Sequence, residues 1–230
     1  MPRKKWLLLI AATALLGLPG RSLWADDLQQ VLKELDASAA KFHATSADFE
    51  FDTNQTEPVP DQDVMKGTAY YERNGASFSM AAHVKQENGA DAPKTYMFTD
   101  GSLKLFQPSI NQVTTIKRAS AFESYLMLGF GASGKDLADK WEIKDDGAET
   151  LDGVKTEKLE LVAKDPTVRK NLPKVTVWMD TTRAISLKQV FDVGQGVTRT
   201  SLYFNIKLNQ PLPADAFKFK TDRKTTYQEQ

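Results

Sequence analysis

Apolar residues recur with two different periods along this chain of 230 residues. Between Leu28 and Phe42 they fall three or four positions apart, which is the period of an amphipathic helix, and Asp26 or Asp27 can cap it. Beyond residue 48 apolar and polar residues alternate with period two, which is typical of half-buried antiparallel strands. Asn-Gly and Asp-Gly pairs between these stretches predict turns. The pattern predicts one leading helix followed by a long strand meander.

The last alternating stretch shows this pattern clearly. Leu202, Phe204, Ile206 and Leu208 are separated by single residues, two of which are Asn205 and Lys207. Because successive strand residues point to opposite faces, the spacing places these four apolar side chains on one face of a sheet.

A second helical patch, residues 120–128, interrupts the meander and is followed by glycines. Gly129, Gly131 and Gly134 fit the dinucleotide motif G-x-G-x-x-G, and with Lys135 they fit most of a P-loop. Both motifs require a strand before the glycines and a helix after them, whereas here the predicted helix precedes them. Asp136 also stands where a P-loop needs Ser or Thr. We therefore expect a helix end and a loop here, and no nucleotide cofactor.

The N-terminus has the layout of a secretory signal peptide. A basic start, Met1–Lys5, precedes an apolar run over residues 6–18, Pro19-Gly20 and the small residue Ala25. The alternative is a membrane anchor, but the apolar run is shorter than the roughly 20 residues that a bilayer span requires. We expect residues 1–25 to be removed and residues 26–230 to form a single exported domain.

Composition narrows the function classes. The 30 basic and 30 acidic residues balance, and cleavage would remove four basic residues, leaving a net charge of about −4. That charge argues against nucleic-acid binding. The chain has no Cys, and its two histidines, His43 and His83, lack partners at the spacing of a metal or catalytic motif. We expect no metal site, no cofactor and no enzymatic activity.

Several segments, in order along the chain, resemble the LolA-like family of periplasmic outer-membrane lipoprotein carriers. These segments are LDASAAKFHATSADFEF (35–51), GTAYYERN (67–74), YMFTDGSLKLFQPSINQVTTI (96–116), KVTVWMD (174–180) and TSLYFNIKLNQPLPADAFKFK (200–220). The resemblance implies an α+β fold, an unclosed antiparallel β half-barrel with helices covering the concave face. It also implies an apolar cavity for acyl chains, closed by a lid helix that residues 128–136 would let move.

The function implied by the resemblance is transport. A monomeric periplasmic carrier would take lipoprotein acyl chains, or another lipid, from an inner-membrane donor protein to an outer-membrane acceptor protein. One alternative is a periplasmic lipid or lipoprotein sensor with the same cavity. A lipid hydrolase is a third alternative, but it needs a nucleophile and a base that the sequence does not offer.

The candidate cavity residues are apolar positions on the predicted helices and strands, and ordinary core packing is an equal alternative for each. They are Leu35, Phe42, Tyr71, Phe78, Met80, Met97, Tyr125, Met127 and Leu128. The resemblance makes Arg73 a latch that holds the lid closed, with a solvated turn charge as the alternative. The residues after Phe219 lack the family's Pro-Pro-Gly segment and extra strand, so we expect a frayed tail.

Overall fold

The computed structural model describes residues 23–75, 77–99, 101–116 and 128–229. Within them the strands are β1 (Ala44–Gln55), β2 (Asp61–Asn74), β3 (Ser77–Glu87), β4 (Ala90–Thr99), β5 (Ser102–Gln107), β6 (Gln112–Ile116), β7 (Trp141–Leu151), β8 (Val154–Ala163), β9 (Lys174–Asp180), β10 (Ile185–Gly194), β11 (Val197–Leu208) and β12 (Thr226–Glu229). The helices are α1 (Leu23–Ala39), α3 (Gly134–Lys140) and α4 (Pro166–Asn171), with a 3-10 turn, η1 (Pro108–Ile110).

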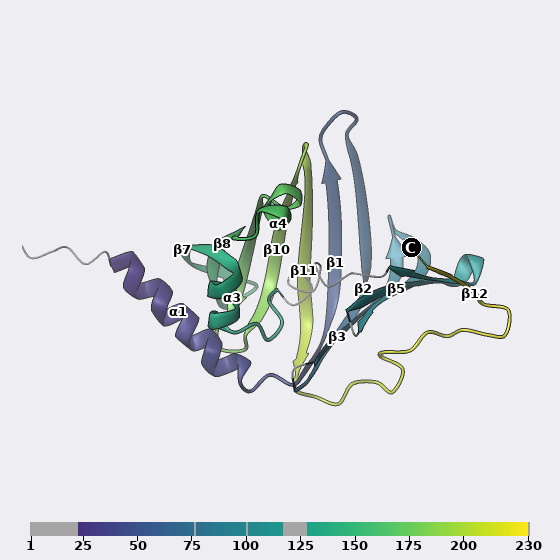
Figure 1. The fold of residues 1–230 in the computed structure, drawn as a ribbon, viewed down its shortest axis with the longest axis horizontal. Coiled ribbons are helices and arrows are strands. Elements are labelled where there is room, and N and C mark those ends of the chain that lie inside the picture. Colours follow the sequence, from purple (N-terminus) through teal and green to yellow (C-terminus); the bar gives the residue numbers. More distant parts are fainter. Residues whose placement is uncertain (1–22, 76, 100, 117–127, 230) are drawn as a thin grey trace, which may run out of the picture.

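The strands form one sheet of twelve, in the order β12-β6-β5-β4-β3-β2-β1-β11-β10-β9-β8-β7 (Figure 1). Neighbouring strands are antiparallel except β12 and β6, which are parallel. Strands β7 and β12 are the two edges, so the sheet does not close. The expected α+β half-barrel is confirmed.

Helices α1 and α3 pack against one end of the sheet, beside β7 (Figure 1). Helix α1 begins at Leu23, before the Asp26 or Asp27 cap that the sequence suggested, and runs through the expected cleavage position. Residues 23–25 are Leu, Trp and Ala, none of which breaks a helix, so nothing in the sequence stops the helix from extending this far.

Two apolar clusters divide the interior. The packed half comprises β7, β8 and β9 with α1 and α3; its buried side chains include Leu35, Leu159, Leu161 and Val175, each 0% exposed. The cavity half comprises β1–β5 and β11, and its cluster is richer in aromatic residues and methionine. Strand β10 lies between them.

The C-terminal segment, residues 209–225, corrects the expectation of a frayed tail. It lies along the outer face of β3–β5, where the Ala216 carbonyl oxygen lies 2.9 Å from His83 Nε2 and the rings of Phe106 and Phe219 lie 5.7 Å apart. Asn111 Nδ2 then donates to Asp222, and β12 adds an edge strand beside β6. The extra strand is therefore present without a Pro-Pro-Gly segment.

Strand β11 corrects the expected single apolar face. A β-bulge opposite Ser46–Asp48 includes Asn205 at φ 51° and reverses the alternation. Leu202 and Phe204 consequently lie on the outer face, 38% and 45% exposed, whereas Leu208 lies on the inner face with Thr45.

Among the described residues, no helix is long and apolar enough to cross a membrane.

Candidate functional site: an apolar cavity

A cavity of about 420 Å³ lies on the concave side of the cavity half. That volume is within the range of small-molecule pockets and well above the space that one water molecule occupies. Its lining comes from seven strands: Phe49, Phe51, Thr53, Met65, Ala69, Tyr71, Met80, Ala82, Val84, Tyr96, Leu103, Gln189, Phe191, Arg199, Ser201 and Tyr203. The site can therefore hold an apolar ligand of moderate size.

Small residues provide the space. Ala47, Ala69 and Ala82 are direct cross-strand partners on β1, β2 and β3, and Ala82 in turn pairs with Tyr96 on β4. Because directly opposed residues share a face, this row of methyl groups leaves a depression between the larger rings around it. Met65 and Met80 add flexible thioethers, which adapt to irregular ligands.

An aromatic cluster borders the cavity through Tyr71 and Tyr203. The Tyr71 ring stacks on Phe130 with centroids 3.7 Å apart, and the Tyr203 ring meets Phe130 edge-on at 4.7 Å. Burial raises the pKa of the Tyr71 hydroxyl well above its ordinary value and also raises the pKa of Tyr203. Tyr203 shares hydrogen bonds with Tyr71 and Ser201, so these neutral hydroxyls satisfy one another and leave apolar ring faces toward the cavity.

The segment 128–132 packs against this aromatic cluster through Phe130 and is held by several hydrogen bonds. Arg73 Nη2 donates to the Gly131 carbonyl oxygen at 2.8 Å, and Gly131 N–H donates to Ala184 at 2.9 Å. Ser186 N–H donates to the Gly129 carbonyl oxygen at 2.7 Å, and the side-chain amide of Gln189 donates to the Leu128 carbonyl oxygen. The Arg73 side chain therefore contacts the segment that follows the expected lid.

The glycines of this segment serve close packing. Gly129 and Gly131 have φ of +82° and +70°, and an added Cβ would lie 2.2 Å from Ser186 Cβ and 2.5 Å from the Phe42 ring, respectively. The sequence had suggested that these glycines let a lid move, but their buried, hydrogen-bonded positions correct that view. The predicted lid helix itself lies outside the described residues.

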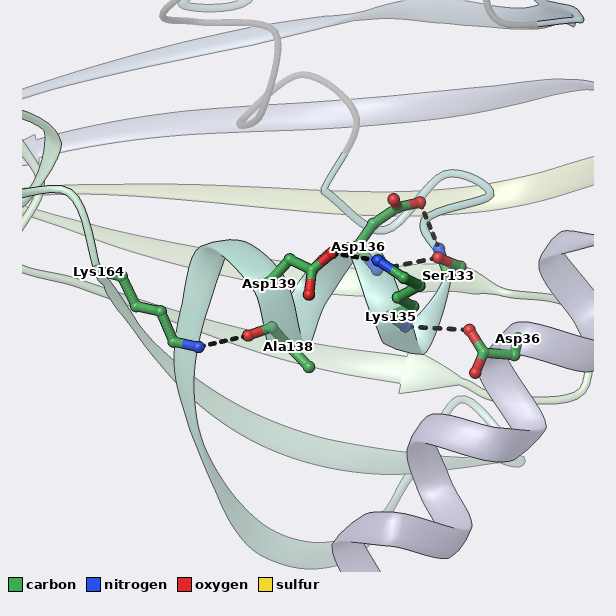
Figure 2. Close-up of polar contacts among 7 residues, drawn as sticks. All are labelled: Asp36, Ser133, Lys135, Asp136, Ala138, Asp139 and Lys164. Atoms are coloured by element: carbon green, nitrogen blue, oxygen red, sulfur yellow. Dashed lines mark hydrogen bonds and ion pairs between the residues drawn. The ribbon is translucent and has the colours of Figure 1, made fainter.

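Backbone amides of the nucleotide-like motif donate hydrogen bonds to side chains of the protein itself (Figure 2). Helix α3 begins at Gly134, so a helix does leave the glycines, contrary to the expectation of a loop. Ser133 accepts from the Asp136 N–H at 3.0 Å, while the Lys135 N–H donates to Asp36 of α1 at 3.0 Å. The Lys135 ammonium pairs with Asp139 at 2.5 Å. Protein oxygens thus accept from these N-terminal amides, which a phosphate would otherwise engage.

Of the nine residues expected in the cavity, Tyr71 and Met80 line it. The other placed residues of the nine, apart from Met97, are buried in the two apolar clusters: Leu35, Phe42, Phe78 and Leu128. Tyr125 and Met127 lie outside the described residues. Met97 is a correction, because it pairs with Ala81 on the outer face while its neighbours Tyr96 and Phe98 pair with Ala82 and Met80 on the inner face.

Sequence reasoning missed the lining from β10 and β11. Ser201 and Tyr203 alternate with the apolar residues Leu202 and Phe204, so the inner face there was taken to be the outer one. Phe49 and Phe51 were recognised as strand residues but not assigned to the cavity. Their period-two spacing, together with Met65 opposite Phe51, is the signal that could have found them.

The part of the lining that the structure describes contains no acid, histidine or cysteine that could act as a general base. Among the described residues, His83 lies on the outer face of β3, and no cluster of three or more acidic or histidine side chains could hold a metal ion. The apolar lining suits the binding of an apolar ligand.

No protein-family model and no curated protein matches the chain. Solved structures do match it in fold. An uncharacterised conserved protein from Thermus thermophilus has 11% identity and a TM-score of 0.56 over 89% of this chain and 99% of its own. MucB has 10% identity and a TM-score of 0.51, over 84% of this chain and 63% of MucB. A LolA superfamily protein from Nitrosomonas europaea has 15% identity and a TM-score of 0.41, over 84% and 97%. At these identities the likeness is one of fold.

Proposed function

We propose that this chain is a periplasmic carrier that holds the acyl chains of a lipoprotein, or of a related lipid, in the concave cavity. The observation that carries the proposal is the 420 Å³ space bordered by aromatic, aliphatic and methionine side chains. Moving a methylene from water into such a space is favourable by roughly 0.8 kcal/mol, so an acyl chain that cannot cross water alone can cross inside a protein. The basic and apolar start of the sequence supports export, with residues 26–230 as the mature carrier.

Transfer requires a donor and an acceptor, which we propose to be inner-membrane and outer-membrane proteins that meet a monomeric carrier. Arg73 would act as a latch by holding the segment 128–132 against the cavity half. The 2.8 Å bond to Gly131 supports that role because a guanidinium donates a charge-assisted hydrogen bond to a carbonyl that is only partly exposed to water.

The test fills the cavity. Ala82 lines it beside Ala69, and Ala82→Phe would place a ring in the space that an acyl chain needs. Ala148→Phe adds the same ring at an exposed position of β7 and is the matched control. Binding of the apolar dye N-phenyl-1-naphthylamine, and its displacement by a diacylated peptide, is measured by fluorescence on lipid-free protein.

The parent and Ala148→Phe should bind the dye to saturation and release it to the peptide. Ala82→Phe should bind about tenfold more weakly or worse, a loss of about 1.4 kcal/mol. Equal binding by a folded Ala82→Phe variant would contradict the proposed cavity. Binding of the dye without displacement by the peptide would argue against acyl chains as cargo.

A further inference from the structure

The cavity lining changes character along β11. Tyr203, Ser201 and Arg199 alternate on its inner face, so they follow one another along the cavity. From Tyr203 to Arg199 is four residues, or about 13 Å along a strand. Tyr203 lies in the aromatic cluster, whereas Arg199 is exposed and lies close to the β10–β11 turn. Arg199 therefore marks the mouth of the cavity.

Arg199 is the one charged residue among the described residues that line the cavity. Its cross-strand neighbours on the inner face are Thr53 of β1 and Phe191 of β10, neither of which can neutralise it. In the part of the chain that the structure describes, no carboxylate forms an ion pair with Arg199.

Two charged groups on the neighbouring strands β2 and β4 already have partners. Asp63, which pairs with Thr53 on β2, accepts a hydrogen bond from Asn88 at 3.0 Å. Lys94 of β4 is paired with Glu87 at 2.5 Å. The Arg199 side chain is thus exposed at the edge of an apolar space.

We propose that Arg199 binds the anionic headgroup, a carboxylate or phosphate, of a lipid whose acyl chain occupies the cavity. This inference rests on the proposed function and adds a class of ligand to it. A guanidinium offers a planar set of donors that matches the oxygens of either group, and a bound chain would hold the headgroup beside it. The site at the mouth is exposed to water, which limits the contribution of the pair.

The test uses three ligands with one chain length: dodecanoate, dodecyl phosphate and dodecanol. Each displaces N-phenyl-1-naphthylamine from the parent, Arg199→Gln, Arg199→Lys and Arg223→Gln. Arg223 lies exposed on the C-terminal segment, so Arg223→Gln removes the same charge away from the cavity. Inorganic phosphate is added in a further arm.

Arg199→Gln should bind both anions about fivefold more weakly and dodecanol as the parent does, while Arg223→Gln should match the parent throughout. The affinity of Arg199→Lys for the anions should lie between those of Arg199→Gln and the parent, since lysine keeps the charge but lacks the planar set of donors. Unchanged affinity of Arg199→Gln for both anions would overturn the inference and leave Arg199 a solvated charge. Equal weakening for dodecanol would overturn it as well.

Inorganic phosphate should leave the affinity for dodecanoate unchanged, because it lacks a chain to hold it in place. Competition by phosphate that disappears in Arg199→Gln would show a free-anion site and overturn the assignment to a lipid headgroup. Failure of the proposed function looks different, because dodecanol and the dye would then not bind the parent at all.

Discussion

The packed half and the cavity half are built from the same kind of alternating strands, yet their inward faces are covered differently. In the packed half, Leu159, Leu161, Val175 and Val177 are fully buried beneath α1 and α3. In the cavity half, Phe49, Tyr71 and Met80 face about 420 Å³ of open space. The difference shows that strand pattern sets which residues face inward, whereas the covering elements decide whether that face becomes core or site.

Specific contacts keep α1 over the packed half. Thr181 Oγ1 donates to Glu34 at 2.9 Å, and Ser38 Oγ donates to the Thr182 carbonyl oxygen at 3.1 Å, which ties the helix to the β9–β10 turn. An added Cβ on Gly134 would lie 2.1 Å from the Leu32 carbonyl oxygen, so α3 fits against α1 only because residue 134 is glycine. Helix α1 is thus fixed away from the cavity.

The largest effects are expected from truncating one buried residue in each half, which tests this comparison directly. Leu161→Ala, in the packed half, should lower the free energy of unfolding by about 2 to 5 kcal/mol because it opens a new void in a filled core. Met80→Ala, at a residue that is also buried but already beside open space, should cost only about 1 to 2 kcal/mol. Urea unfolding of the lipid-free variants measures both.

Similar losses for the two variants would mean that the cavity half is packed as tightly as the other half in solution. The apolar ligand sharpens the contrast further. Binding of N-phenyl-1-naphthylamine should weaken in Met80→Ala and remain at the parent's level in Leu161→Ala.

Much of the architecture follows from the sequence. The leading helix, the alternating strands and the open half-barrel were expected from periodicity and from the resemblance, and Tyr71 and Met80 were placed in the cavity. The helix and the strands are local features that periodicity predicts, whereas the half-barrel and the cavity positions were implied by the resemblance. A periodic pattern is visible in any single sequence because it needs no knowledge of which segments meet.

The remaining site depends on contacts between distant segments. At Asn205 one extra residue reverses the face of β11, and the run Leu202-x-Phe204-x-Ile206 gives no sign of it. At Met97 both faces of β4 are apolar, since the C-terminal segment covers the outer one, so alternation cannot tell inside from outside. The frayed tail expected after Phe219 was wrong for the same reason: Asp222 is bonded to Asn111 and β12 pairs with β6, and both partners are more than a hundred residues away.

Arg73 joins the two halves, and its removal is expected to have the next largest effect. The segment it holds contributes Leu128 and Ala132 to the packed half and Phe130 to the cavity half. Arg73→Leu keeps apolar bulk but gives up a charge-assisted hydrogen bond to Gly131, a loss of about 1.5 to 3 kcal/mol. Hydrogen exchange of the Gly131 amide, which is bonded to Ala184, should become faster than in the parent.

Exchange in β9, around Val175 and Val177, is the internal control and should not change. Arg73→Lys should give an intermediate exchange rate because one ammonium replaces the planar fork. If the Gly131 amide exchanges equally slowly in a folded Arg73→Leu variant, the latch role is wrong and Arg73 is a solvated charge beside a turn.

The cavity half is also supported from outside, because the C-terminal segment packs on its outer face. Ala216 is 1% exposed against the outer face, and Phe219 packs on Phe106 there. Strands that border a cavity make fewer van der Waals contacts on their inner face, and the C-terminal segment supplies such contacts on the outer face. His83 lies at the centre of this contact, between β3 and the Ala216 carbonyl oxygen.

The smallest expected effect is a pH dependence of this outer support. Burial is the largest influence on His83 and lowers its pKa below the ordinary value, while the Ala216 hydrogen bond and Asp215 partly offset the shift and Lys220 and Lys85 add to it. The unfolded chain therefore binds a proton at His83 before the folded protein does. Stability from this group is fully present above the unfolded pKa of about 6.5 and is lost as the pH falls toward the folded pKa.

The His83→Gln variant can still donate a hydrogen bond to the Ala216 carbonyl oxygen but does not titrate. Urea unfolding at about pH 7.5 and about pH 5.5 should show a larger loss of stability in the parent than in His83→Gln, and all other titrating groups cancel in that difference. Equal losses would mean that the C-terminal segment does not bury His83, and that the cavity half lacks this outer support.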